Sequence, residues 1–174
     1  MEGYKTMLAE VDTQLKELHL PSATHAIAGV GAGSWAESVA AHYKAKSPTA
    51  KFIAVEPTEA ASLKSSLEAG KITSIKTGHT IMNGLNCGTT SLTAWEVLKH
   101  GVDASLTVTD VDVHHDLLYL HGQGVKNGPC GASTLSALRK ACQEEREALG
   151  LDEKSVVILY STEGVRDYII PDGA

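Results

Sequence analysis

The chain of 174 residues has few aromatic side chains, 5% of the total, and a single phenylalanine. It also lacks a basic stripe, because its 15 Lys and Arg are scattered among 21 Asp and Glu and the formal net charge is -6. We therefore expect no nucleic-acid partner. No apolar run approaches the length of a bilayer crossing, and the first residues lack the apolar core of a signal peptide. These absences predict no membrane association and a cytoplasmic location.

Cysteine is also scarce, and its pattern is not that of a disulfide framework. Cys87, Cys130 and Cys142 are an odd number of residues at wide spacing, without a CxxC pair. This usage favours a reducing compartment. A chain of this length buries enough surface to fold without a disulfide or metal. We expect one domain over residues 1–174.

Hydrophobic periodicity predicts that helices and strands alternate along the chain. Apolar residues recur at helical spacing from Tyr4 to Leu18, which indicates an amphipathic helix ending near Pro21. Further helices are expected over residues 34–46, 58–69, 90–100, 110–121 and 132–149. Short apolar runs, typical of buried parallel strands, lie at residues 26–30, 52–55, 104–108 and 156–159. The predicted fold class is an α/β three-layer sandwich with a mostly parallel sheet of about four strands.

The clearest local motif is a glycine-rich turn between the first expected strand and the following helix. Gly29, Gly31 and Gly33 precede Ser34, where the helix is expected to begin. Glycine lets the backbone approach an anion closely, and the free N–H groups at the helix start favour negative charge. The motif therefore predicts a phosphate-binding loop. The alternative is a tight turn that needs glycine only for packing.

A dinucleotide-binding fold competes with this interpretation. Glu56 closes the next strand about 25 residues further on, where such a fold places its ribose-binding acid. Against it, Ser34 stands where the third glycine of GxGxxG belongs, and Pro57 follows Glu56 directly.

Several short segments occur in the order expected of one enzyme family. They are Gly3-Tyr4-Lys5-Thr6-Met7, Ala28-Gly29-Val30-Gly31, Val55-Glu56-Pro57, the run from Thr80 to Gly88, Trp95-Glu96-Val97-Leu98, Gly128-Pro129-Cys130-Gly131-Ala132 and Ser161-Thr162-Glu163-Gly164. Together they resemble the C-terminal half of the diaminopropionate ammonia-lyases, which are pyridoxal-phosphate enzymes of the tryptophan-synthase-beta (type II) fold, and the resemblance covers nearly the whole chain.

The resemblance implies the large domain of such an enzyme and a cofactor site. Ser161 would face the pyridine nitrogen of the cofactor. The loop that holds the cofactor phosphate would consist of Gly29, Val30, Gly31, Ala32, Gly33 and Ser34. In the family, the Schiff-base lysine and the small domain lie before the region that this chain resembles, and Lys5 falls after the position of the lysine motif. We therefore expect a truncated domain without the catalytic lysine.

Without that lysine, a pyridoxal enzyme loses its internal aldimine and usually its general base. The expected function is a small-molecule enzyme of lyase, isomerase or cyclase type that uses acid–base chemistry in the old pocket. Pyridoxal phosphate would not be required, although non-covalent binding is conceivable. The alternative is a non-catalytic module that binds pyridoxal phosphate or another anion, or a partner subunit of a full-length relative. A remnant that binds nothing is the third explanation.

Three residues are the candidates for catalysis. His79 lies in the glycine-punctuated loop over residues 70–89, and imidazole is suited to proton transfer near neutral pH; the alternative is an exposed loop histidine. Cys130 precedes an expected helix, where a thiolate is stabilised, or is a buried inert thiol. Glu163 could orient a histidine.

Two further expectations concern metals and partners. His114 and His121 could share a helix face, but no further ligand is placed beside them, so we expect no metal. The resemblance implies a dimer, and loss of the small domain should expose apolar surface that a partner covers. The expected partners are a small-molecule substrate and a second copy of the chain.

Overall fold

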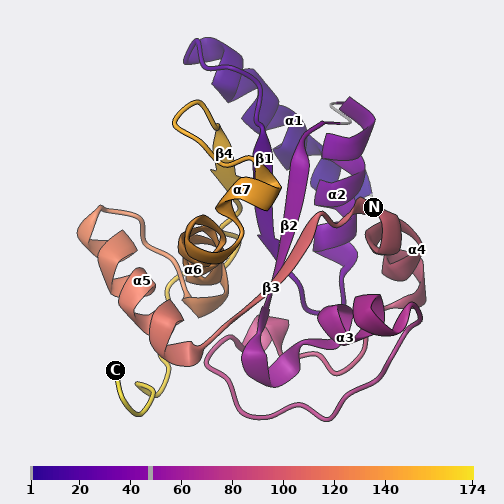
Figure 1. The fold of residues 1–174 in the computed structure, drawn as a ribbon. Coiled ribbons are helices and arrows are strands. Elements are labelled where there is room, and N and C mark those ends of the chain that lie inside the picture. Colours follow the sequence, from indigo (N-terminus) through magenta and orange to yellow (C-terminus); the bar gives the residue numbers. More distant parts are fainter. Residues whose placement is uncertain (1, 47–48) are drawn as a thin grey trace.

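The computed structural model describes residues 2–46 and 49–174 and contains a four-stranded, all-parallel sheet (Figure 1). Its strands are β1 (His25–Gly29), β2 (Lys51–Pro57), β3 (Ala104–Val108) and β4 (Val157–Leu159), in the order β3-β2-β1-β4. The predicted α/β fold with a mostly parallel sheet is thus confirmed. All four strands lie within two residues of the positions predicted from apolar runs.

Helices cover both faces of the sheet, which makes the three layers. One face carries α1 (Glu2–Glu17), α2 (Ser34–Lys46), α3 (Ser62–Ala69) and α4 (Leu92–Gly101); the other carries α5 (Asp110–Gly122), α6 (Pro129–Glu144) and α7 (Arg146–Leu149) (Figure 1). Two short 3-10 turns, η1 (Thr58–Ala60) and η2 (Asn83–Leu85), lie in the connections.

Two apolar cores result from the alternation of side chains along the central strands. In β1, Ala26 and Ala28 pack against the first group of helices, whereas Ile27 packs against the second. All three side chains are fully buried. Small residues on one face let α2 approach closely, and larger ones on the other fill the space beneath α6.

Two predicted helices differ from the structure by more than a shift of one end, because a break or a 3-10 turn falls within the expected range. The helix expected over residues 132–149 begins at Pro129 and is interrupted at Glu145, so that α6 and α7 are separate. Proline is well suited to the first helical position because it has no N–H to lose there. The helix expected over residues 58–69 begins as the η1 turn and becomes α-helical only at Ser62.

None of the helices in residues 2–46 and 49–174 combines the length and the apolar character that a bilayer crossing requires.

The strand order places a crevice at the carboxyl ends of β1 and β4. From β1 the chain passes to β2 and β3 on one side, whereas β4 pairs with β1 on the other. Open parallel sheets bind ligands at such a reversal of strand order. Gly29 ends β1 there, and Tyr160 follows β4.

Glu56, near the end of β2, is a fully buried carboxylate that holds the start of α3. Its two oxygens accept hydrogen bonds from the backbone N–H groups of Leu63 at 2.7 Å and Lys64 at 2.9 Å. Burial raises the pKa of Glu56 to about 7, although these N–H groups oppose the shift. Glu56, the candidate for binding the ribose of a dinucleotide, thus binds the first backbone N–H groups of α3 instead.

This burial predicts a pH dependence of stability. An acid with a pKa raised on folding stabilises the fold fully below its ordinary pKa of 4.5 and loses that contribution as pH rises through about 7. We expect the free energy of unfolding of the wild type, relative to Glu56→Gln, to fall by about 3 kcal/mol between pH 4 and pH 8. Urea unfolding of both proteins at several pH values measures this difference. A difference that stays constant or rises with pH contradicts the assignment.

Candidate functional site

A cavity of about 490 Å³ lies at the carboxyl ends of β1 and β4. The turn from β1 into α2 forms one wall, and the segment after β4 forms another. The η2 turn and the start of α6 complete the lining. The lining residues are Gly29, Gly31, Ala32, Gly33, Ser34, Trp35, Ala36, Gly84, Leu85, Cys130, Tyr160, Thr162, Glu163 and Gly164.

Two glycines of the β1–α2 turn are required by close contacts. A Cβ on Gly31 would lie 2.7 Å from the carbonyl oxygen of Gly84, and one on Gly33 would lie 2.8 Å from the Cβ of Ala94. Gly33 also has a φ of +102°, a conformation that other residues rarely adopt. The Ala32 carbonyl accepts from the Ser91 N–H at 2.9 Å, which ties the turn to the start of α4.

Several backbone N–H groups of the turn have no hydrogen-bond acceptor among the described residues. The Val30 N–H donates to Val55, and the Glu37 N–H donates to Gly33. From Gly31 to Ala36, the N–H groups donate to no atom of the described residues. Such a run of N–H groups at a helix start, with the positive end of the helix dipole, attracts anions.

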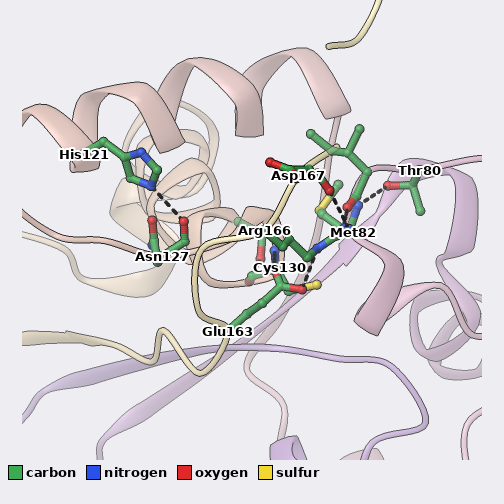
Figure 2. A network of polar contacts seen from close by, with 10 residues as sticks. Thr80, Met82, His121, Asn127, Cys130, Glu163, Arg166 and Asp167 are labelled. Atoms are coloured by element: carbon green, nitrogen blue, oxygen red, sulfur yellow. Dashed lines mark hydrogen bonds and ion pairs between the residues drawn. The ribbon is translucent and has the colours of Figure 1, made fainter. Parts of the chain in front are cut away.

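Glu163 joins the segment after β4 to the start of α6 by a hydrogen bond (Figure 2). Its carboxylate accepts from the Cys130 N–H at 2.7 Å and from Arg166 Nε at 3.0 Å. Arg166 also donates to the Ile81 carbonyl, so that one ion pair links three segments around the cavity. A Cβ on Gly128 would lie 2.5 Å from the Glu163 carboxylate. Both Glu163 oxygens therefore already hold other groups.

Cys130 lines the cavity at the start of α6, as predicted, but its thiol is a very weak acid. Burial and the neighbouring Glu163 charge raise the pKa of Cys130 to about 12. These effects outweigh the benefit that the helix N-terminus gives to a thiolate. The geometry therefore favours a protonated thiol.

Ser161 lies between two lining residues, Tyr160 and Thr162, and its hydroxyl accepts from Asn127 Nδ2 at 3.0 Å. Tyr160 is buried and is fixed by a hydrogen bond of 2.8 Å between its hydroxyl and that of Tyr43. The end of β4 is therefore held against α2.

The structure brings some predicted site residues together and separates others. Cys130 and Glu163 share the cavity with the loop residues, except that Val30 is buried beneath it. His79 is exposed and lines a different cavity of about 300 Å³, beside Glu59 and Asp110. It therefore lies apart from Cys130 and Glu163, and its catalytic role stays a prediction.

The two helix histidines considered as ligands have other partners. His114 Nδ1 lies 2.8 Å from the Tyr168 hydroxyl, and His121 Nε2 donates to the Asn127 carbonyl at 2.8 Å. Within residues 2–46 and 49–174, no three metal-ligating side chains gather at a site that could hold a metal ion.

The sequence reasoning overlooked Asn127 and Arg166. Asn127 contacts Ser161, 34 residues away in the sequence, whereas Arg166 contacts Glu163, three residues away, and also the distant Ile81 carbonyl. Local periodicity carries no signal for such pairings. The only cue was that Asn127 directly precedes the Gly128-Pro129-Cys130 motif.

The family described as "Pyridoxal-phosphate dependent enzyme" matches residues 1–162. A diaminopropionate ammonia-lyase from Salmonella typhimurium is 29% identical over 184 residues, covering 94% of this chain and 45% of that protein. The resemblance found in the sequence motifs is thereby confirmed. The chain spans about half the length of the curated relative it matches.

Solved structures show the same fold. Diaminopropionate ammonia lyase from Escherichia coli in complex with D-serine has a TM-score of 0.81 and 26% identity, over 93% of this chain and 43% of that one. The threonine deaminase of T.th. has a TM-score of 0.78 and 26% identity, over 92% and 55%. Maize serine racemase has a TM-score of 0.77 and 25% identity, over 88% and 46%.

The raised pKa of Cys130 predicts slow alkylation. At pH 7.5 iodoacetamide should modify the exposed Cys142 at least ~10-fold faster than Cys130, because only the thiolate reacts. The Cys130 rate should keep rising to pH 10 without a plateau, and Glu163→Gln should increase it at pH 9 by removing a neighbouring negative charge. Peptide mass spectrometry over a pH series measures both rates. A plateau below pH 9 would show a stabilised thiolate.

Proposed function

Because the chain belongs to the family of pyridoxal-phosphate-dependent enzymes, we propose that its β1–α2 turn binds the phosphate of pyridoxal phosphate in a site of the ammonia-lyase type. One observation carries the proposal: the residues from Gly31 to Ala36 line a cavity, and their N–H groups find no acceptor among the described residues. A phosphate supplies several acceptor oxygens and the negative charge that a helix start favours.

The residues present fit this cofactor. The cavity volume lies within the range of roughly 300–1,000 Å³ that is usual for small-molecule sites. The loop from Gly29 to Ser34 carries no carboxylate that would repel a phosphate. Pyridoxal phosphate, when bound, supplies an electron sink for carbanions.

This chain's residues would bind and orient the cofactor. The turn would hold the phosphate by its N–H groups, and Ser161 would contact the pyridine nitrogen. Tyr160, fixed by Tyr43, would form a rigid wall beside the ring. The ion pair of Glu163 and Arg166 would keep the segment after β4 closed against α6.

The cofactor would be held here without a covalent bond to this chain, since no lysine is among the described residues that line the cavity. A cofactor-independent lyase, isomerase or cyclase is the second candidate. It needs a proton carrier in the cavity, but the Cys130 thiol is held protonated and the Glu163 oxygens are engaged. The geometry therefore favours cofactor binding over acid–base catalysis by these residues.

A homodimer, a small-molecule substrate and a cytoplasmic location accompany this proposal as predictions. Sedimentation at micromolar concentration tests the first, and a monomer mass would contradict it.

Titration with pyridoxal phosphate tests the binding proposal. We expect saturable binding by calorimetry and competition by pyridoxine 5′-phosphate. Borohydride treatment reduces any Schiff bases at surface lysines, but pyridoxine 5′-phosphate should not lower the yield of such adducts. The competitor lacks the aldehyde, so it separates cavity binding from Schiff bases at surface lysines. A suppressible adduct would show that a lysine of this chain reaches the site. Absence of saturable binding would contradict the proposal.

A pair of matched substitutions at Ala32, one charged and one neutral, tests whether the loop holds the phosphate. Ala32 is exposed, lines the cavity and lies outside the positive-φ region, so that side chains are tolerated there. Ala32→Asp should weaken binding of pyridoxine 5′-phosphate by ~10-fold or more through like-charge repulsion, whereas the nearly isosteric Ala32→Asn should bind almost as the wild type does. Equal affinities of the two variants would place the phosphate elsewhere.

A further inference from the structure

Asn83 and Gly84 form an Asn-Gly sequence at the edge of the cavity. Both residues are exposed, and Gly84 lines the cavity. They lie in the η2 turn, whose backbone is held by hydrogen bonds from Leu85 to Met82 at 2.9 Å and from Asn86 to Asn83 at 3.2 Å. A short exposed turn of this kind opens locally at a low free-energy cost.

A second Asn-Gly sequence, Asn127-Gly128, lies in a different environment. Asn127 is 2% exposed, and Gly128 is also buried. The Gly128 N–H donates to the Glu163 carbonyl at 3.0 Å, and the Asn127 amide nitrogen donates to Ser161 Oγ at 3.0 Å. The same dipeptide therefore occurs once in an exposed turn and once fixed in the interior.

The exposed pair meets the chemical requirements for deamidation. The Gly84 nitrogen loses its proton to water and attacks Cγ of Asn83, ammonia leaves, and a five-membered succinimide forms. Water then opens the ring to aspartate or isoaspartate, so that an amide and water become a carboxylate and ammonium. Glycine favours the attack because it has no side chain in the way and adopts most backbone conformations. In the folded chain the Gly84 N–H has the Cys130 sulfur as its partner, which is a weak acceptor.

The Asn83 amide lies beside the ion pair of Glu163 and Arg166. Its groups are satisfied when the nitrogen donates to the Thr80 carbonyl at 2.8 Å and the oxygen accepts from Arg166 Nη1 at 3.3 Å. The hydrogen bond from Arg166 draws electrons from the amide carbon, which favours attack on it. A carboxylate at this position would compete with Glu163 for the Arg166 guanidinium. It would also place a negative charge next to Gly84 in the cavity wall.

We propose that Asn83 is a site of spontaneous deamidation, and that the carboxylate formed there weakens phosphate binding in the cavity. The effect on binding rests on the proposed function, whereas the reaction at Asn83 does not. Like charges repel, and salt screens their repulsion. Deamidation would thus convert a phosphate-binding chain slowly and irreversibly into a weaker binder.

Incubation of the wild-type chain at pH 8 tests the reaction. Peptide mass spectrometry should show that Asn83 deamidates at least ~10-fold faster than Asn127, since the buried pair reacts only after a larger opening of the structure. Unfolding in urea should remove the difference, because both Asn-Gly sequences are then equally accessible. Equal rates in the folded chain, or a faster reaction at Asn127, would overturn the assignment.

Matched variants of an exposed side chain test the effect on the cavity. Asn83→Asp carries the charge of the product, whereas Asn83→Gln keeps the amide and cannot form a five-membered ring. At low ionic strength Asn83→Asp should bind pyridoxine 5′-phosphate ~3-fold or more weakly than Asn83→Gln does, and high salt should narrow the gap. The deamidated fraction of the aged wild type, separated by ion exchange, should behave like Asn83→Asp.

The possible failures are distinguishable. Equal affinities of Asn83→Asp and Asn83→Gln, or a gap that high salt leaves unchanged, would overturn the effect on binding and leave the phosphate site intact. If the fresh wild type shows no saturable binding, the proposed function fails and the effect on affinity fails with it. The rates at Asn83 and Asn127 still decide where deamidation occurs.

Discussion

Where a chain passes from a strand into a helix, its backbone N–H groups need hydrogen-bond acceptors. In this chain the N–H groups from Gly31 to Ala36 have none among the described residues. The neighbouring segments that the structure describes hold the turn in place but do not supply acceptors for these N–H groups. Gly31 and Gly33 pack closely against Gly84 and Ala94, and the Ala32 carbonyl accepts a hydrogen bond from Ser91 at the start of α4. The sheet order then places the turn where strands diverge from β1. An anion bound there would satisfy the donors that the fold leaves open.

The opposite wall depends on a single ion pair. Glu163 and Arg166 join the segment after β4 to the start of α6 and to the Ile81 carbonyl. This arrangement uses the carboxylate for structure and raises the pKa of the Cys130 thiol beside it. Cys130 and Glu163, two of the three residues predicted to act in catalysis, thus both line the cavity.

The fold and the glycine-turn side of the site could be predicted from the sequence, because both depend on local patterns of apolar residues and glycines. Residues 34–46 were expected as a helix and form α2 with those bounds, and the glycine turn was expected where it lies. The start of α6 at Pro129 and the break at Glu145 were missed, because periodicity continues across them. The surroundings of His79 could not be predicted, because residues 70–89 have no periodicity and only tertiary contacts decide which cavity they line.

The most direct measurement of the central claim is a backbone ¹H–¹⁵N spectrum of the chain during titration with pyridoxine 5′-phosphate. The account predicts saturable shifts that concentrate on the amides of residues 31–36, with the helix residues around Arg139 and Lys140, which line a separate polar cavity, left unchanged. Shifts that concentrate at Arg139 and Lys140, or titration without saturation at the turn, would contradict a phosphate site formed by the glycine loop.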